Sequence, residues 1–262
     1  ELLEITFKKK FNIEYLNWLY KENPSGHAIT YNAWHNNNIV AHYTVVPMKF
    51  KYNASLGICA YSLNTATHPS YTGKGLFQKL ANLTYEKAIR KQCSFIYGVS
   101  NSQSTWVFEN KLGFKNYGPL HVKFGFGAFN RSLKKKSKIL VSWNDEILKW
   151  RLNRPGSNYN ITKSKNNIKI WKKFFLFKIL MFESEDKINF QDIELGQDKF
   201  YRPISVYIGN DSSYTKNKLF YFDFPKIFKP SPLNLIFKKL NNKDQDYETN
   251  PMVIEPLGFD IF

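Results

Sequence analysis

The stretch that decides how this sequence is interpreted is Thr-Ala-Thr-His-Pro-Ser-Tyr-Thr-Gly-Lys-Gly-Leu-Phe, residues 65–77. It joins the end of a predicted strand to a predicted helix that begins at Leu76. Gly73 and Gly75 allow positive φ angles, so successive N–H groups can turn toward the positive end of the helix dipole. This order of strand, glycine turn and helix predicts an anion site suited to a pyrophosphate, to which Lys74 adds charge. A plain tight turn is the alternative.

The segments around this stretch predict an α+β domain with a mixed sheet. Hydrophobic periodicity separates helices from strands, and Asn, Gly and Pro clusters mark the turns between them. The predicted elements are, in chain order, a helix (11–22), three antiparallel strands (27–34, 39–52, 58–67), a helix (76–90), a strand (95–99), a helix (101–111) and one or two strands across 115–126.

A second, smaller α+β unit is predicted after the basic run 131–138. The expected organisation is a first domain over 1–128, a basic linker over 129–144 and a second domain over 145–262. The elements predicted in the second domain are a helix (145–152), a hairpin of 159–162 with 168–181, and strands at 203–208, 218–224 and 233–240. Its aromatic residues are expected in core and sheet packing, among them Trp171, Phe174, Phe175, Phe177, Tyr221, Phe222 and Phe224.

A weak internal repeat relates the two halves. Residues 15–18 followed by the turn 23–26 are similar to residues 147–150 followed by the turn 154–157, and strands follow both turns. A true structural repeat and a chance likeness between two helix–turn–hairpin segments are both open at this point.

Composition narrows the class of protein. The chain has 262 residues, of which 43% are hydrophobic and 17% aromatic, and this excludes a disordered chain. The net charge of +17 fits a lysine-rich surface, an anionic cofactor or substrate, an anionic lipid surface or nucleic acid. No recognition motif accompanies the charge, so nucleic acid is not expected as a partner.

The two cysteines, Cys59 and Cys93, have no neighbours at metal-ligand spacing and are expected as small core residues, with no metal site. They favour a reducing, cytoplasmic location. The most apolar run, 170–182, is short and contains lysines, so no transmembrane segment is expected, and residues 1–10 do not look like a secretory signal.

Three blocks of sequence resemble the GNAT superfamily of N-acetyltransferases. They are His-Pro-Ser-Tyr-Thr-Gly-Lys-Gly-Leu-Phe at 68–77, Tyr-Gly-Val-Ser-Asn-Ser-Gln-Ser at 97–104 and Phe-Glu-Asn-Lys-Leu-Gly-Phe at 108–114. The resemblance covers residues 1–127 and is greatest to members that carry a second, degenerate GNAT-like half. It implies the GNAT acyltransferase fold in the first half and acetyl-CoA, or another short acyl-CoA, as co-substrate.

The resemblance also implies which residues bind CoA. The loop and first helical turn would hold the pyrophosphate, the end of the preceding strand would pair with the pantetheine arm, and Asn101 would contact a pantetheine amide. The implied residues are Thr65, Ala66, Thr67, Thr72, Gly73, Lys74, Gly75, Leu76, Phe77 and Asn101. Thr72 stands where the similar family variant has Arg, which removes a common phosphate contact.

The catalytic residues are less clear, because the glutamate base of many relatives is absent from 58–67 and their tyrosine acid has no counterpart. The candidates are His68, Glu109 and Ser104, with Tyr117 or water as alternatives for protonating the thiolate. His42 is expected to be a satisfied core side chain.

The function implied is transfer of an acetyl or short acyl group from CoA to a primary amine. An amino sugar or a sugar nucleotide is the first acceptor to consider, and the second half would build the acceptor side. A catalytically silent CoA-binding or interaction module is the alternative, and no oligomeric state is predicted.

Overall fold

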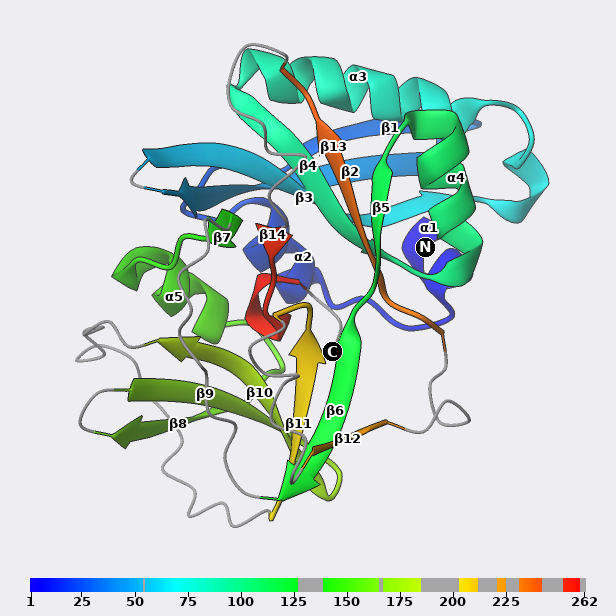
Figure 1. Cartoon of the computed structure of the whole chain (residues 1–262). Helices are drawn as coiled ribbons and strands as arrows, with labels where there is room; N and C mark the ends of the chain where they lie inside the picture. Colours follow the sequence, from blue (N-terminus) through cyan, green and yellow to red (C-terminus); the bar gives the residue numbers. More distant parts are fainter. Residues whose placement is uncertain are drawn as a thin grey trace.

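The computed structural model describes residues 1–53, 55–126, 139–164, 167–184, 203–211, 221–224, 231–241 and 252–259. Two β-sheets with helices around them make up this part of the chain (Figure 1). The basic run 131–138 lies outside the described residues. No helix among those described is long and apolar enough to cross a membrane.

The first sheet, sheet A, has the order β14-β7-β2-β3-β4-β13-β5, and β1 also pairs with β2. Only β3–β4 and β7–β14 are parallel pairs among these neighbours. Its strands are β1 (Ile29–His35), β2 (Asn38–Tyr52), β3 (Ser55–Thr67), β4 (Cys93–Ser100), β5 (Lys115–Pro119), β7 (Ile139–Val141), β13 (Asn234–Lys239) and β14 (Met252–Val253). The short strand β7 lies inside the segment predicted to be a linker.

Helices α3 (Leu76–Arg90) and α4 (Ser102–Leu112) cover one face of sheet A. The apolar stripe of α3 packs on β2, where the hydroxyls of Tyr43 and Tyr85 are 2.7 Å apart. Asn101 caps the N-terminus of α4, and Gly113, at φ 67°, ends it. The predicted spans of both helices are confirmed to within one residue at each end.

The other face of sheet A carries α2 (Ile13–Tyr20) and α5 (Asp145–Leu152), while α1 (Leu2–Phe7) packs against β3. The sequence pattern predicted α2 and α5. It missed α1, which has only six residues and mixes charged with apolar side chains.

The second sheet, sheet B, has the order β12-β6-β11-β10-β9-β8. Its strands are β6 (His121–Phe126), β8 (Tyr159–Ser164), β9 (Asn167–Phe174), β10 (Phe177–Ser184), β11 (Ile204–Gly209) and β12 (Tyr221–Asp223). The single strand predicted over 168–181 is wrong. Phe175, at φ 49°, and Leu176 form a turn between β9 and β10, and neither residue belongs to the usual turn formers.

The strands of the two sheets are paired in the same order of parallel and antiparallel neighbours. The path β1-β2-β3-β4-β13-β5 in sheet A and the path β8-β9-β10-β11-β6-β12 in sheet B both read antiparallel, antiparallel, parallel, antiparallel, antiparallel. The fifth strand of each path comes from the opposite part of the chain. The early strand β6 serves sheet B, and the late strand β13 serves sheet A.

The two segments matched as a sequence repeat meet between the sheets. Trp18 and Trp150 stack with ring centroids 4.8 Å apart. The indole N–H of Trp18 donates to the carbonyl of Trp150 at 2.8 Å, and that of Trp150 donates to the carbonyl of Trp18 at 3.0 Å. Buried Arg151 lies against both rings and donates from Nε to the Leu257 carbonyl at 2.7 Å.

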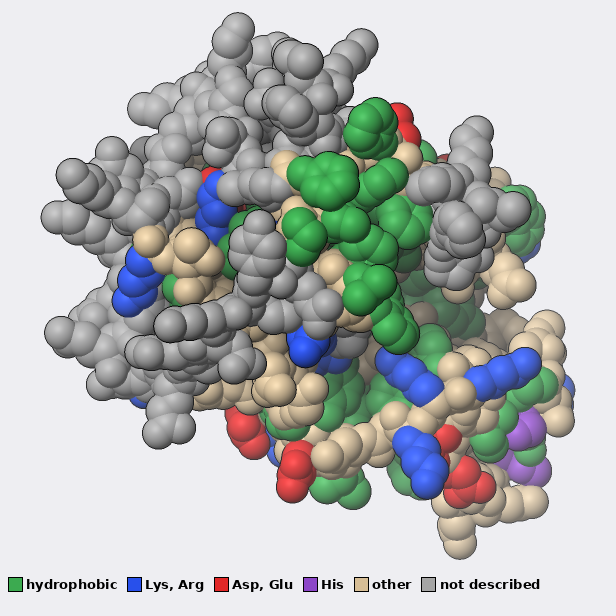
Figure 2. All heavy atoms as spheres, turned by 90° about the horizontal axis from the view of Figure 1, so that it is seen from below, with side chains coloured by type: hydrophobic (Ala, Val, Ile, Leu, Met, Phe, Trp, Pro, Cys, Tyr) green, Lys and Arg blue, Asp and Glu red, His purple; other side chains and the backbone are tan. Residues whose placement is uncertain are grey.

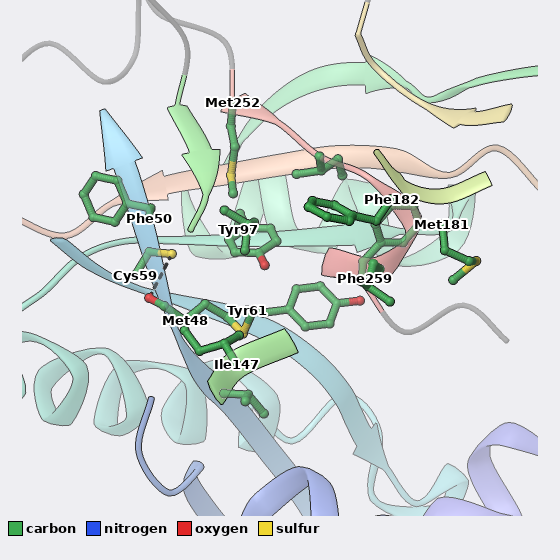
Figure 3. Packing of buried hydrophobic residues seen from close by; sticks show 14 of the residues in the cluster. Met48, Phe50, Cys59, Tyr61, Tyr97, Ile147, Met181, Phe182, Met252 and Phe259 are labelled. Carbon is green, nitrogen blue, oxygen red and sulfur yellow. Dashed lines mark hydrogen bonds between the residues drawn. The ribbon is translucent and has the colours of Figure 1, made fainter. Parts of the chain in front are cut away.

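One hydrophobic core joins the two sheets (Figure 3). Met48 and Tyr61 of sheet A contribute to the same cluster as Met181 and Phe182 of sheet B, and Phe259 also belongs to it. Both cysteines are fully buried, as predicted.

The aromatic residues of the second half that were expected in core and sheet packing are buried only in part. Trp171 is buried, but Phe174, Phe175 and Phe222 are exposed to 43%, 77% and 58%. Phe222 lies on β12 at the end of sheet B, and Figure 2, which looks at the molecule from that side, shows hydrophobic side chains gathered at the surface.

Candidate active site

The parallel strands β3 and β4 separate before they end. Their paired residues run from Ile58 and Cys93 to Ser62 and Gly98, whereas β3 continues to Thr67. Beyond Ser62, β3 stays paired with β2 on its other side. The edge of β3 that faces β4 therefore has no strand partner over residues 63–67 within the described part of the chain. The interval where the two strands are no longer paired is called the opening.

A β-bulge lies at the start of this opening. His42 pairs with Ala66 and Thr44 with Leu63, so β3 has one residue more than β2 in this interval. Asn64 takes up the extra length with φ 49°. The bulge turns the Asn64 side chain toward α2, where its amide nitrogen donates to Tyr20 Oη at 3.1 Å.

The glycine loop after β3 is open to a ligand. Gly73 and Gly75 have φ of 76° and 72°, and a Cβ added to either would have no neighbour within 4 Å. Among the described residues, no hydrogen bond engages the amides of Gly73, Lys74 or Gly75. The amides of residues 76–78, at the start of α3, have no intrahelical acceptor either, and the first such bond runs from the Lys79 amide to the Gly75 carbonyl. This cluster of free N–H groups fits an anion such as a pyrophosphate.

The rest of the predicted CoA-binding set surrounds this loop and the opening. Thr72 is held in place because its N–H and its hydroxyl both donate to the Pro69 carbonyl. Lys74 Nζ lies 4.7 Å from the centre of the Tyr71 ring. The hydroxyl of Thr67 is buried and has no hydrogen-bond partner among the residues that the structure describes, so a polar group is available beside the opening.

Asn101, predicted to contact pantetheine, uses its side-chain oxygen to cap α4. That oxygen accepts from the Ser104 amide and from the Ser104 hydroxyl, both at 2.9 Å.

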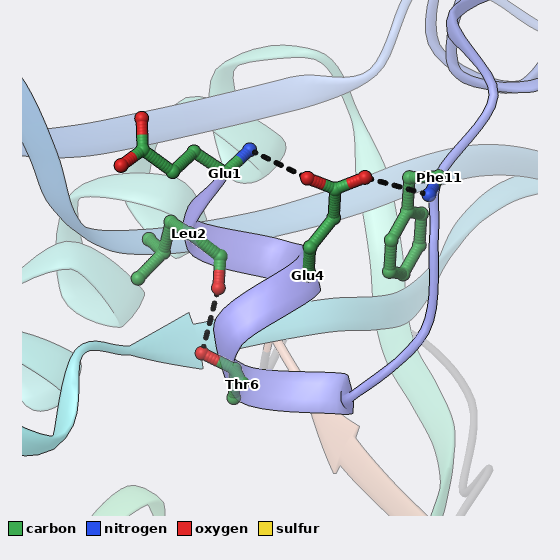
Figure 4. Close-up of polar contacts among 5 residues, drawn as sticks. All are labelled: Glu1, Leu2, Glu4, Thr6 and Phe11. Carbon is green, nitrogen blue, oxygen red and sulfur yellow. Dashed lines mark hydrogen bonds and ion pairs between the residues drawn. The ribbon is translucent and has the colours of Figure 1, made fainter.

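A pocket of about 940 Å³ lies next to this region, on the face of sheet A that carries α2. Tyr20 and His42 line one part of it, and His68 and Tyr71, which precede the glycine loop, line another. Residues of α1 line one side of the pocket. The Glu4 carboxylate accepts from the Phe11 amide at 3.3 Å and so ties α1 to the segment that leads into α2 (Figure 4).

A chain of hydrogen bonds joins the bulge to this pocket. Tyr20 Oη, which accepts from Asn64, lies 3.4 Å from His42 Nε2, and His42 Nδ1 lies 2.7 Å from Asn32 Oδ1. Since the Asn32 oxygen only accepts, Nδ1 carries the ring proton, and Nε2 accepts from the Tyr20 hydroxyl. Burial lowers the pKa of His42 from 6.5 to about 4, which agrees with this neutral form.

The three predicted catalytic residues are not linked to one another. His68 Nδ1 accepts from the Ser70 amide at 3.3 Å, and the Ser104 hydroxyl donates within the cap of α4. Glu109 is exposed on α4. No hydrogen bond or ion pair within the described part of the chain connects any two of them.

The polar chain was not predicted. His42 was expected as a satisfied core residue, and it is indeed 8% exposed and hydrogen-bonded. The other members of the polar chain come from α2, β1 and β3, so no spacing in the sequence relates them to His42. A strand register that places Asn32 opposite His42 is the one signal that indicates the pair.

Comparison with known protein families finds a match for the first part of the chain. Residues 2–114 match the model of the acetyltransferase (GNAT) family. This stretch of the chain is similar in sequence to a GNAT domain. No curated protein matches the sequence.

Solved structures extend the similarity of fold beyond the GNAT domain. A GCN5-related N-acetyltransferase from Anabaena variabilis aligns at TM-score 0.59 and 11% identity, covering 92% of this chain and 69% of its own. A conserved protein of unknown function from Enterococcus faecalis V583 aligns at TM-score 0.59 and 10% identity, covering 91% of this chain and 68% of its own. A GCN5-related N-acetyltransferase from Kribbella flavida aligns at TM-score 0.54 and 12% identity, covering 80% of this chain and 59% of its own. At these identities the similarity shows the fold, which is the GNAT-like α+β fold expected from the sequence.

Proposed function

We propose that this protein is an N-acyltransferase that moves an acetyl or other short acyl group from CoA to a primary amine. The observation that carries the proposal is the combination of an open glycine loop at the start of α3 with the separation of β3 from β4. Either feature alone occurs in many folds, whereas the two together match the needs of one ligand that carries both a pyrophosphate and a peptide-like arm.

The loop supplies the binding site for the pyrophosphate. The amides of Gly73, Lys74 and Gly75 make no hydrogen bond among the described residues and lie next to the start of α3, and the ammonium group of Lys74 adds a positive charge. Thr72 brings no charge where the similar family variant has Arg, so the proposed site depends on backbone amides more than on side chains.

The opening supplies the binding site for pantetheine. The backbone of Thr65, Ala66 and Thr67 has no described strand partner on the side that faces β4, and the amides of pantetheine can pair with it as an added strand would. This places the thioester near the bulge at Asn64. The residues then speed the reaction by holding the thioester and the amine together, which lowers the entropic cost of their encounter.

We further propose that the second half has the same ancestry as the first but no CoA site of its own. The repeated order of strand pairings supports this idea, and its glycines, Gly156, Gly196, Gly209 and Gly258, are isolated along the sequence. The predicted domain boundaries at 128 and 145 are kept in this proposal, with the exchange of β6 and β13 across them.

Calorimetry with acetyl-CoA and with CoA tests the proposal. We expect saturable binding of both at micromolar concentrations, and no heat of binding at high micromolar ligand would overturn it. The alternative, a silent CoA-binding module, predicts binding without turnover. Release of free thiol from acetyl-CoA in the presence of a panel of primary amines separates the two, because only an enzyme releases CoA at a rate that depends on the amine.

A further inference from the structure

The pocket beside the bulge differs in charge from the strongly basic chain as a whole. The chain contains 38 lysines and arginines, yet none is among the described residues that line this pocket. Its polar groups are the neutral or acidic side chains of Glu4, Thr30, Asn32 and Tyr20, together with histidines, and apolar residues such as Leu16 and Val40 form the rest of the wall. No lysine or arginine side chain in this lining offers a counter-charge to a phosphate or a carboxylate.

The polar chain connects this pocket to the opening between β3 and β4. Tyr20 lines the pocket and at the same time bonds to Asn64 at the bulge, where the thioester is placed by the proposed function. The Tyr20 and His42 rings lie nearly parallel, with an angle of 28° and centroids 6.1 Å apart. His42 is therefore held on one side by Asn32 and on the other by Tyr20, which fixes the direction of the Tyr20 hydroxyl.

The corresponding positions of the second half lack this chain. Alignment of Trp18 with Trp150 places Leu152 at the position of Tyr20. The register of β8, β9 and β10 places Lys169, paired with Thr162 and Glu183, at the position of His42. Lys169 Nζ and the Glu183 carboxylate form a buried ion pair at 3.2 Å. The Asn–His–Tyr chain therefore occurs in the half that has the glycine loop, and the half without the loop has an aliphatic residue and an ion pair at these positions.

We propose that this pocket receives the acceptor, that Tyr20 is the catalytic residue that contacts its amino group, and that His42 and Asn32 are positioning residues for Tyr20. The acceptor class that fits is a primary amine with an apolar part and without phosphate or carboxylate groups. This inference rests on the proposed function, because it assumes that the thioester lies at the bulge.

The proton follows the direction of the hydrogen bonds. The amine N–H takes the place of the Asn64 amide at Tyr20 Oη. As the nitrogen–carbon bond forms and the carbon–sulfur bond breaks, sulfur leaves with the electron pair of that bond. The nitrogen loses one proton to Tyr20 Oη while the Tyr20 proton passes to His42 Nε2. Solvent protonates the thiolate and takes the proton back from His42, so the net change is one proton moved from nitrogen to sulfur.

The test compares Tyr20→Phe with a matched control, Tyr31→Phe. Tyr31 is the neighbour of Asn32 on β1 and packs in the core cluster on the opposite face of the sheet. Both substitutions remove one oxygen and keep the ring. We expect Tyr20→Phe to lower kcat for amine acetylation about 100-fold, with the Kd for acetyl-CoA within twofold of the wild type. Tyr31→Phe should change neither.

The positioning role of His42 has its own readout. His42→Gln keeps an oxygen that can accept from Tyr20, whereas His42→Leu does not, so the first should retain more of kcat than the second. In the double variant of Tyr20→Phe with His42→Leu, the losses should not multiply, because both remove the same function. A merely structural His42 would give multiplied losses, and a Gln variant no better than the Leu variant would also contradict the role.

The acceptor class is tested with tyramine and phenethylamine as apolar amines and UDP-glucosamine as an anionic one. We expect kcat/KM to be highest for the apolar amines. Turnover of UDP-glucosamine in preference to them, or full activity of Tyr20→Phe, would overturn this inference and leave the proposed function intact. Turnover of no amine by a protein that binds acetyl-CoA, or absence of acetyl-CoA binding in the wild type, would instead overturn the proposed function.

Discussion

Sheets A and B share a framework but differ in what occupies the point where their parallel strands separate. In sheet A the pairing of β3 with β4 ends at Ser62 and Gly98, with a bulge just beyond. In sheet B the pairing of β10 with β11 ends at Leu180 and Tyr207, and the register between β10 and β9 likewise shifts directly after Leu180.

The C-terminal segment packs against the separation in sheet B. The 3₁₀ turn η3 (Pro256–Gly258) lies against β10, and Met252, Ile254 and Phe259 are buried in the shared core. A Cβ added to Gly209 of β11 would lie 2.5 Å from Tyr207 Oη and 2.9 Å from the Ile254 carbonyl oxygen. By contrast, a Cβ on Gly73 or Gly75 would meet nothing among the described residues. The same order of strand pairings is therefore compatible with an open site or a filled one. The glycine loop leaves the site in sheet A open, and the packing of the C-terminal segment fills the corresponding place in sheet B.

The largest expected effect is at the contact that joins the two halves. Trp18→Ala removes a buried stacked ring and one of two reciprocal hydrogen bonds, so we expect a loss of about 4 kcal/mol in the free energy of unfolding. Trp150→Ala should cost a similar amount. The double variant should lose less than the sum, because each single change already removes the shared contact. Urea denaturation followed by circular dichroism measures all three.

Trp106→Ala is the control, since Trp106 is 57% exposed on α4 and lies outside this contact. We expect its free energy of unfolding to stay within about 0.5 kcal/mol of the wild type. If the two sheets unfolded in separate transitions, or if Trp18→Ala cost less than about 1 kcal/mol, the view that Trp18 and Trp150 hold one cooperative core would be wrong.

The parts of this fold that could be predicted are those with local signals. The spans of α3 and α5 are read correctly from apolar periodicity, and the glycine loop is visible because Gly73 and Gly75 are close together in sequence. The strands β7 and β14 have three and two residues. The pairing of β7 with β2 and of β14 with β7, rather than their composition, makes them strands. The exchange of β6 and β13 depends on contacts between residues far apart in the chain, such as Val122 with Ile208 and Gly98 with Ile236, for which local periodicity carries no signal.

The candidate site also has one part with a local sequence signal and one part without it. Its proposed anion-binding part is one continuous segment, so a local motif was enough to propose it residue by residue. Its polar chain draws Tyr20, Asn32, His42 and Asn64 from four elements, and the direction of Asn64 depends on a bulge that appears only once β2 and β3 are paired.

Two open glycine turns, one at the proposed pyrophosphate site and one away from it, allow a matched comparison. Gly75 and Gly156 have nearly the same φ, 72° and 74°, and the same empty surroundings, but Gly156 lies in the turn before β8. Gly75→Glu places a carboxylate at the proposed pyrophosphate site, so we expect acetyl-CoA binding to weaken at least about 100-fold, on the order of 3 kcal/mol. Calorimetry measures the Kd.

Gly156→Glu imposes the same backbone strain and the same charge, and it should leave the Kd within twofold of the wild type. Equal weakening by both variants would mean that strain or net charge, and not a local anion site, determines the effect.

The smallest expected effect concerns His42, whose counterpart in sheet B is Lys169. Because burial lowers the pKa of His42 to about 4 in the folded protein, the unfolded chain binds more protons between pH 4 and 6.5. The contribution of His42 is therefore fully present above pH 6.5 and decreases as the pH falls. Between pH 6.5 and 5 we expect about 1.5 kcal/mol of the free energy of unfolding to be lost through this group. Denaturant titrations at a series of pH values measure the slope.

His42→Gln should flatten that slope, while His27→Gln, at an exposed position, should leave it unchanged. The groups that line the same pocket, namely Tyr20, His35, His68, Glu1 and Glu4, are present in the wild type and in both variants, so the difference between the wild type and His42→Gln isolates His42. A slope that stays the same in His42→Gln would mean that the imidazole has the same pKa in the folded protein as in the unfolded chain. In that case His42 could not serve as the neutral, directed partner that Tyr20 requires.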